Sequence, residues 1–208
     1  MANMLDYVFW RGDLTFENVP FNEIDALILC QITYLNFDNI ISRDFTEKAI
    51  SLKDLNTVLS RSENLEKIKN VGAMINMDSW NLFTKAALSV RFGSLKAWGF
   101  VNKIDREKEE QFAAVTYTYS GDKKNKNKFN CIVFRGTDDT IVGWKEDFNL
   151  GYMETVPAQN DALSYVKEVC SKVKGPIKIA GHSKGGNLAI YSSTFSEEKI
   201  QKRIQDIY

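Results

Sequence analysis

The sequence has little of what metal centres and disulfide scaffolds require. It contains one histidine, His182, and three scattered cysteines among 208 residues. A structural metal site needs a cluster of such ligands, so no metal is expected, and no cofactor is implied. The cysteines stand in apolar surroundings without motif spacing, which is typical of reduced core thiols in a cytosolic protein; they are Cys30, Cys131 and Cys170.

Long apolar runs and an excess of charge are also missing. No run approaches the ~18 residues of a transmembrane helix, and the start, MANMLDYVFW, does not resemble a signal peptide. We therefore expect a soluble, cytoplasmic protein without a transmembrane segment. Basic and acidic residues number 27 each, so no global field attracts nucleic acid. The basic run at 122–128 is interpreted as a solvated hairpin tip rather than a nucleic-acid patch.

The length is sufficient for one sizeable core, and the pattern changes near Gly93. Residues 1–92 are predicted to be a helical N-terminal region that packs on the core. Asn22 is a candidate N-cap for the first helix, over 22–37. Further helical spacing covers 45–60, 62–77 and 78–93, with Asp78 as a cap and Gly93 as the end of the last helix.

Residues 93–208 are predicted to form the core of an α/β fold. Strand patterns cover 94–104, 111–120 and 129–137, the last two as an antiparallel pair. Helices at 143–152, 158–174 and 182–195 then alternate with strands at 175–181 and 203–208. Such alternation indicates a parallel sheet with crossover helices.

The segment GHSKG, residues 181–185, matches G-x-S-x-G between the buried strand and a helix. In this context Ser183 is a candidate nucleophile on a sharp turn, and Gly181 and Gly185 allow strand and helix to approach closely. The helix N-terminus favours a developing negative charge, and the backbone N–H of Lys184 is a candidate oxyanion donor.

The glycines of this segment have three other interpretations. A P-loop needs a lysine and a hydroxyl after its last glycine, but Asn187 and Leu188 follow Gly186. The dinucleotide fingerprint fails on glycine spacing. A glycine-rich turn that only serves packing remains an open alternative.

A second motif, FRGT at 134–137, leads from a buried strand into a turn and a helix. An α/β hydrolase takes its second oxyanion donor from a loop after an early strand. Thr137 suits that role through its N–H and its hydroxyl. Arg135 is expected to hold the loop through a carboxylate such as Asp138 or Asp139.

Together, FRGT…GW…D and IAGHSKGGNLA resemble the class 3 lipase pattern of the α/β-hydrolase superfamily. QFAAVTY, FRGTDDTIVGWKEDFN, PAQNDALSYV and GHSKGGNLAIYSS resemble more closely a bacterial family of lipase-like α/β hydrolases described as a domain of unknown function. The likeness covers roughly 111–208. It implies an α/β-hydrolase-like partial sheet, Ser183 as nucleophile, and Thr137 with Lys184 as oxyanion hole. It also implies that Asp147 orients the Thr137 hydroxyl, although Trp144 as a core aromatic and Asp147 as a surface charge remain alternatives.

A serine nucleophile needs a base, and the sequence offers no good one. Adjacent side chains diverge on a tight turn, so His182 is expected to pack or hydrogen-bond beneath it. The Lys184 side chain leaves in its own direction, and nothing in the local sequence buries it enough to make it the base of a Ser–Lys dyad. The family resembled places an Asp and then a His after the last strand, and Asp206 lies inside that strand. We therefore expect a fragment without its triad acid and base, nearly inactive by itself.

The predicted function is a serine hydrolase acting on a small-molecule or lipid ester. The alternative is a non-catalytic binding module with a hydrolase fold. Acyl length, the role of the N-terminal helices and oligomeric state are not determined by the sequence.

Overall fold

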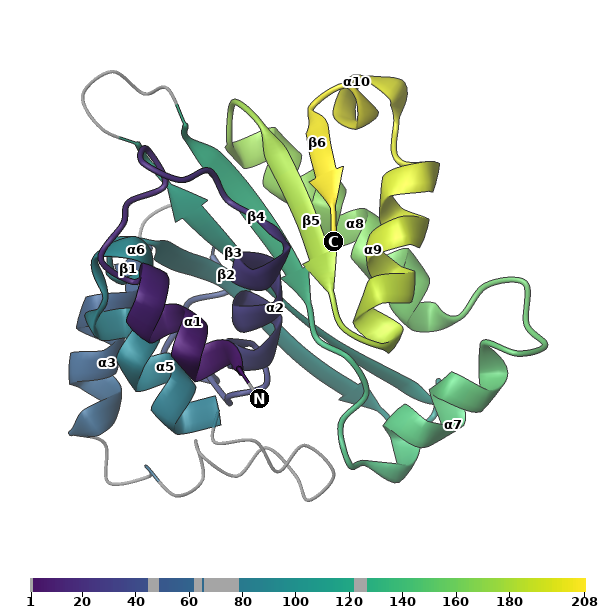
Figure 1. Cartoon of the computed structure of the whole chain (residues 1–208). Helices are drawn as coiled ribbons and strands as arrows, with labels where there is room; N and C mark the ends of the chain where they lie inside the picture. Colours follow the sequence, from purple (N-terminus) through teal and green to yellow (C-terminus); the bar gives the residue numbers. More distant parts are fainter. Residues whose placement is uncertain (1, 45–48, 62–64, 66–78, 122–126) are drawn as a thin grey trace.

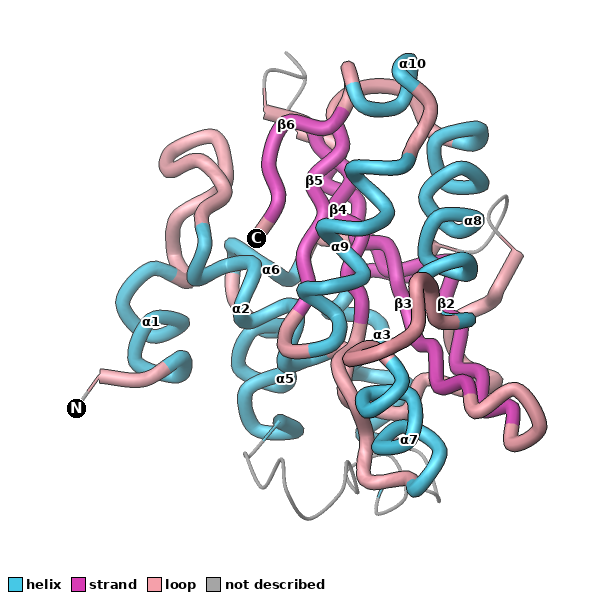
Figure 2. The backbone as a smooth tube through the Cα atoms, turned by 90° about the vertical axis from the view of Figure 1, so that its right-hand side faces the viewer, coloured by secondary structure: helices cyan, strands magenta, loops and turns pink. Residues whose placement is uncertain are grey.

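The fold is a mixed sheet with helices on both faces (Figures 1 and 2). The computed structural model describes residues 2–44, 49–61, 65, 79–121 and 127–208. Within these ranges one six-stranded sheet runs in chain order: β1 Ile50–Ser51, β2 Lys96–Asp105, β3 Glu110–Tyr119, β4 Phe129–Phe134, β5 Ile177–Gly181 and β6 Ile204–Ile207. The general α/β class is therefore confirmed.

The pairing of the strands follows the sequence prediction. β1 to β4 pair antiparallel, and β3 and β4 form the predicted pair, with Val115 opposite Val133. β4, β5 and β6 are parallel, as the strand–helix alternation indicates. All six residues of β4 are buried, which explains why five of them are apolar; the Asn130 side chain accepts a hydrogen bond from Thr118. Residues 122–126 of the basic run lie outside the described residues.

Helices of the N-terminal region cover one face of the sheet (Figure 2). They are α1 Met4–Arg11, α2 Glu23–Ile32, α3 Leu52–Ser60, α5 Ser79–Leu88 and α6 Val90–Gly93. Their apolar side chains share one core with the sheet, for example Leu29 with Val115 and Ala180. The opposite face is covered by α8 Pro157–Lys172 and α9 Lys184–Phe195, whose Val166 and Leu188 pack with Ile179. The remaining helices are α7 Ile141–Asn149 and α10 Glu198–Gln201.

The start of α2 confirms the predicted cap. The Asn22 side chain accepts hydrogen bonds from the N–H groups of Ile24 and Asp25, and the Asp25 carboxylate accepts one from the Asn22 N–H. Arg91 in α6 donates to Asp25 at 2.7 Å, and both side chains are fully buried. This ion pair fixes α6 against α2.

Three helical predictions were wrong in their bounds, and α1 was not predicted. The helix predicted over 22–37 ends at Ile32. Residues 45–48 of the predicted helix at 45–60 lie outside the described residues. In its described part the helix begins at Leu52, because the Ser51 hydroxyl caps α3 and Ile50 pairs with Ala97 as β1. The predicted helix at 78–93 breaks at Ser89, whose hydroxyl accepts a hydrogen bond from Phe92 N and begins α6. α6 ends at Gly93 as predicted. The predicted helix at 62–77 and the Asp78 cap lie outside the described residues, except residue 65.

The three cysteines are free and buried. Burial raises the pKa of the Cys30 thiol to about 12, so it stays protonated at neutral pH. In the described ranges each helix is too short or too polar to cross a bilayer, and no group of three His, Cys, Asp or Glu side chains is placed to hold a metal ion.

Candidate functional site

Ser183 occupies a strained turn between β5 and α9. Its backbone has φ 58° and ψ −124°, a conformation that residues with a side chain rarely adopt. Ser183 is the N-cap of α9, yet its hydroxyl makes no capping hydrogen bond. An N-cap serine normally accepts a bond from the first turn of its helix. Here the side chain is exposed, so the hydroxyl is left for another partner.

The glycines beside Ser183 allow backbone contacts that no side chain would permit. A Cβ on Gly181 would lie 2.0 Å from the Gly185 carbonyl oxygen. A Cβ on Gly185 would lie 2.2 Å from the Phe134 carbonyl oxygen. The first turn of α9 therefore rests directly on the ends of β5 and β4, as the motif predicts.

The FRGT loop lies against this turn. It leaves β4, the parallel neighbour of β5, so both segments emerge at the carboxyl edge of the sheet, where α/β proteins place their ligands. A Cβ on Gly136 would lie 3.3 Å from the Ser183 Cβ and 2.5 Å from the His182 carbonyl oxygen. Two motifs that are 47 residues apart in sequence, at Gly136 and Ser183, are thus in contact.

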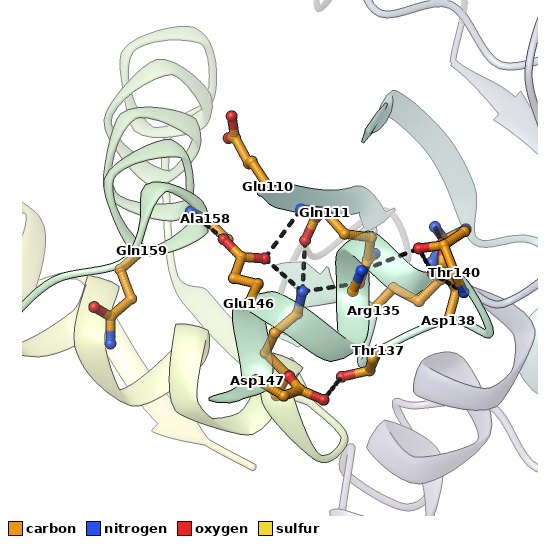
Figure 3. A network of polar contacts seen from close by, with 12 residues as sticks. Glu110, Gln111, Arg135, Thr137, Asp138, Thr140, Glu146, Asp147, Ala158 and Gln159 are labelled. Carbon is orange, nitrogen blue, oxygen red and sulfur yellow. Dashed lines mark hydrogen bonds and ion pairs between the residues drawn. The ribbon is translucent and has the colours of Figure 1, made fainter. Parts of the chain in front are cut away.

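Thr137, the next residue of the loop, is fixed by α7. Its hydroxyl donates to Asp147 Oδ2 at 2.6 Å, as the resemblance implied (Figure 3). The backbone N–H groups of Thr137 and Lys184 make no hydrogen bond within the described part of the chain. Asp147 is thus more than a surface charge. Trp144 is 42% exposed, so its alternative interpretation as a core aromatic was wrong.

Arg135 supports the loop from inside the protein. Its guanidinium is buried and donates to Asn102 Oδ1 at 2.9 Å and to Asp138 Oδ2 at 3.3 Å. Of the two carboxylates proposed from sequence, Asp138 is therefore the partner. Asp138 Oδ1 also accepts bonds from the N–H and hydroxyl of Thr140, which begins α7. These bonds join the loop to the helix that carries Asp147.

His182 forms a hydrogen bond, as expected, but its side chain is exposed rather than enclosed beneath the turn. His182 is exposed, and its Nδ1 lies 3.4 Å from the Tyr34 hydroxyl. The space beneath the turn is filled by backbone, because Gly185 rests on Phe134. A Cβ on Gly136 would lie 2.3 Å from that same hydroxyl oxygen. Burial raises the pKa of Tyr34 to about 12, so the group beside His182 is a neutral phenol at neutral pH.

The local sequence around Lys184 gives no sign of burial, but distant segments bury this side chain. Its side chain is 1% exposed and forms an ion pair with Glu146 on α7, Nζ to Oε2 at 2.7 Å. The ammonium group is therefore directed into the protein rather than toward the exposed Ser183 hydroxyl. Sequence reasoning missed Glu146, and it also missed Tyr34, because their partners are 38 and 148 residues away. No local spacing reveals contacts of that range.

A cavity of about 930 Å³ lies elsewhere, between residues 38–43, β2 and α8. None of Ser183, Thr137 and Lys184 lines it. Asn102 connects this cavity to the FRGT loop, since it lines the cavity and accepts a hydrogen bond from Arg135. The strained backbone and the two free N–H groups mark the surface at Ser183, not this cavity, as the candidate site.

One family model covers both segments of the candidate site. The model of a protein family described as Mbeg1-like matches residues 86–208. The matched stretch is more than half of the chain and contains both the Thr137 loop and the Ser183 turn. No curated protein and no solved structure matches the chain.

The glycine contacts lead to a stability prediction. Gly185→Ala forces a methyl group into the Phe134 backbone and should lower the free energy of unfolding by about 2–3 kcal/mol. Gly186→Ala is the matched control, because its Cβ would lie 3.3 Å from the nearest atom, Gly181 O. That change should stay within about 1 kcal/mol, since alanine also favours the helix. Urea unfolding measures both, and equal losses would contradict the proposed contact.

Proposed function

The chain belongs to the Mbeg1-like family, and we propose that it is a serine hydrolase of the α/β-hydrolase type, related to class 3 lipases, that acts on carboxylic esters. The observation that carries the proposal is the strained, exposed Ser183, with its uncapped hydroxyl next to the Gly136–Thr137 loop. A backbone of this kind is costly and persists where the surrounding structure enforces it, typically at functional sites.

The reaction assigned to this geometry begins with attack by Ser183 Oγ on the ester carbonyl carbon. The carbonyl oxygen becomes an oxyanion and accepts hydrogen bonds from the N–H groups of Thr137 and Lys184. The Thr137 hydroxyl proton points to Asp147, so the backbone N–H is the donor assigned to Thr137. Collapse of the intermediate breaks the ester C–O bond, and the leaving alcohol takes up a proton. Water then hydrolyses the acyl-serine and restores the hydroxyl.

The serine proton needs an acceptor, and in the described part of the chain neither His182 nor Lys184 is placed to serve as one. His182, the single histidine, faces Tyr34, and Lys184 is already paired with Glu146. Loss of a triad histidine costs on the order of 10⁶ in rate in a well-studied serine protease. We therefore expect this chain to turn over esters slowly unless a base is supplied.

The lack of a base for Ser183 favours a second candidate, a non-catalytic binding module. A hydrolase scaffold whose nearest imidazole, His182, faces Tyr34 would bind a ligand at the carboxyl edge of the sheet and leave it unchanged. Its Ser183 would not react even when a base is added, which separates the two candidates.

The side chains of α7 support an apolar ester as substrate. α7 follows Thr137 by four residues, and its Ile141 and Phe148 are 77% and 74% exposed. Trp144 lies between them, and a spacing of three and then four residues places all three on one helical face. Exposed apolar side chains beside the candidate oxyanion loop suit the acyl chain of a small-molecule or lipid ester.

Chemical rescue tests the proposed nucleophile. In the unmodified chain, an alkyl fluorophosphonate should label Ser183 slowly at neutral pH, and added imidazole should raise the labelling rate at least tenfold. Imidazole replaces the missing base, whose positioned form contributes about 10²–10⁴ in rate. Intact-protein and peptide mass spectrometry would measure the rate and the labelled residue.

Ser183→Ala and Ser192→Ala provide the matched controls for this experiment. Ser192 lies on the same helix but is buried and bonded to Leu188 O. Only the first substitution should abolish labelling. Failure of imidazole to produce any Ser183 adduct would sink the hydrolase proposal and favour the binding module.

Probe length tests the apolar substrate. A fluorophosphonate with a long alkyl chain should label Ser183 faster than an ethyl analogue, and Phe148→Ser should slow the long probe about three- to tenfold while leaving the short probe unchanged. The factor corresponds to partial burial of one aromatic side chain. Phe195→Ser, which removes a 62% exposed ring at the far end of α9, is the control. Equal slowing of both probes by Phe148→Ser would contradict acyl contact with α7.

A further inference from the structure

The ammonium group of Lys184 is fully hydrogen-bonded inside the protein. Nζ donates to Glu146 Oε2 at 2.7 Å, to the Gln111 carbonyl oxygen at 2.6 Å and to Gln111 Oε1 at 2.8 Å. Its three donors are thereby used. The side chains of Lys184 and Glu146 are 1% and 0% exposed. A side chain bound in this way holds its position rather than exchanging protons with a substrate.

Glu146 joins four elements at one point (Figure 3). Its Oε2 accepts the bond from Lys184 at the start of α9 and a second bond from Gln111 N on β3, at 3.0 Å. Its Oε1 accepts from Ala158 N in the first turn of α8, at 3.0 Å. The carboxylate therefore fixes α7 relative to β3 and to the first turns of α8 and α9.

A buried ion pair is a poor means of gaining stability, since apolar residues of similar volume often do as well or better. A buried ion pair does fix the relative position of its two side chains, because charged hydrogen bonds require defined positions of both partners. The positions joined here are specific. Lys184 immediately follows Ser183, and Glu146 immediately precedes Asp147, the residue that holds Thr137.

We propose that the Lys184–Glu146 ion pair is a positioning device that sets the two halves of the oxyanion hole at a fixed separation. One half is the backbone N–H of Lys184, held by its own buried side chain. The other is the N–H of Thr137, held through Asp147 by the α7 helix that Glu146 anchors. This inference rests on the proposed hydrolase function and adds two residues that do not touch the substrate.

Glu146→Gln and Lys184→Met test the pair with little change in shape. The fluorophosphonate rate at Ser183, with imidazole present, is measured over a range of probe concentrations to separate apparent affinity from maximal rate. We expect the maximal rate to fall about 10- to 100-fold, the scale of a small misplacement or a weakened oxyanion donor. Apparent affinity should change less than threefold. The double variant should be no slower than the slower single variant, because the pair acts as one unit.

Asp25→Asn is the matched control for loss of a buried ion pair. It removes the carboxylate that pairs with Arg91 in the N-terminal region, which has no bond to the Glu146 network. This variant should melt at a lower temperature. At a temperature where circular dichroism shows the variant and the unmodified chain to be folded, the probe should label Ser183 at the same rate in both. Slowing of the control equal to that of Glu146→Gln would show a general effect of destabilisation and overturn the proposal.

The remaining outcomes also decide the question. Normal maximal rates in folded Glu146→Gln and Lys184→Met would overturn the positioning role and leave the hydrolase proposal intact. Absence of labelling in the unmodified chain would end both. If neither variant folds, Gln111→Met replaces them, since it removes one of the three acceptors and leaves both charges paired. A several-fold lower maximal rate for that variant supports the proposal, and an unchanged rate overturns it.

Discussion

The backbone contact between Gly185 and Phe134 is the constraint on which the geometry around Ser183 depends. It places the first turn of α9 directly on the end of β4, where the FRGT loop begins. Ser183 is then confined between β5 and α9 at a positive φ, and its hydroxyl makes no hydrogen bond to the helix that it begins. Strain of this kind is stable only when neighbouring structure enforces it. Here the packing of two parallel strands and one helix does so.

Polar contacts extend this constraint to the other side of the site. Arg135 and Asp138 hold the loop, Asp147 holds Thr137, and Glu146 holds the helix that carries Asp147. Each of these bonds satisfies a buried or half-buried group that would otherwise be costly to remove from water. The same bonds also hold the segments that carry two free N–H groups, those of Thr137 and Lys184, beside Ser183. In the proposed function, they prepare the site for the charge that develops in the reaction.

Much of this arrangement could be predicted from sequence, because the decisive contacts leave local signs. Asn22 showed the start of α2, strand periodicity showed β3 and β4, and G-x-S-x-G between strand and helix showed the turn at Ser183. The resemblance to lipases supplied the bond between Thr137 and Asp147. Its wider implication, hydrolase activity, stays a prediction.

The parts that could not be predicted depend on contacts between distant segments. β1 forms because Ile50 meets Ala97 across the sheet, and His182 turns outward because Tyr34 of the N-terminal region lies beside it. The burial of Lys184 is decided by Glu146 and Gln111, which are 38 and 73 residues away. A lysine following a nucleophile gives no local indication of such partners.

The central claim is that Ser183 faces an oxyanion hole made by the backbone of Thr137 and Lys184. A crystal structure of the chain after reaction with a fluorophosphonate in imidazole buffer tests it most directly. The account predicts phosphorus bonded to Ser183 Oγ, with the phosphoryl oxygen about 2.7–3.1 Å from the amide nitrogens of Thr137 and Lys184. An adduct whose phosphoryl oxygen points away from both amides, or an adduct on a different residue, would contradict it.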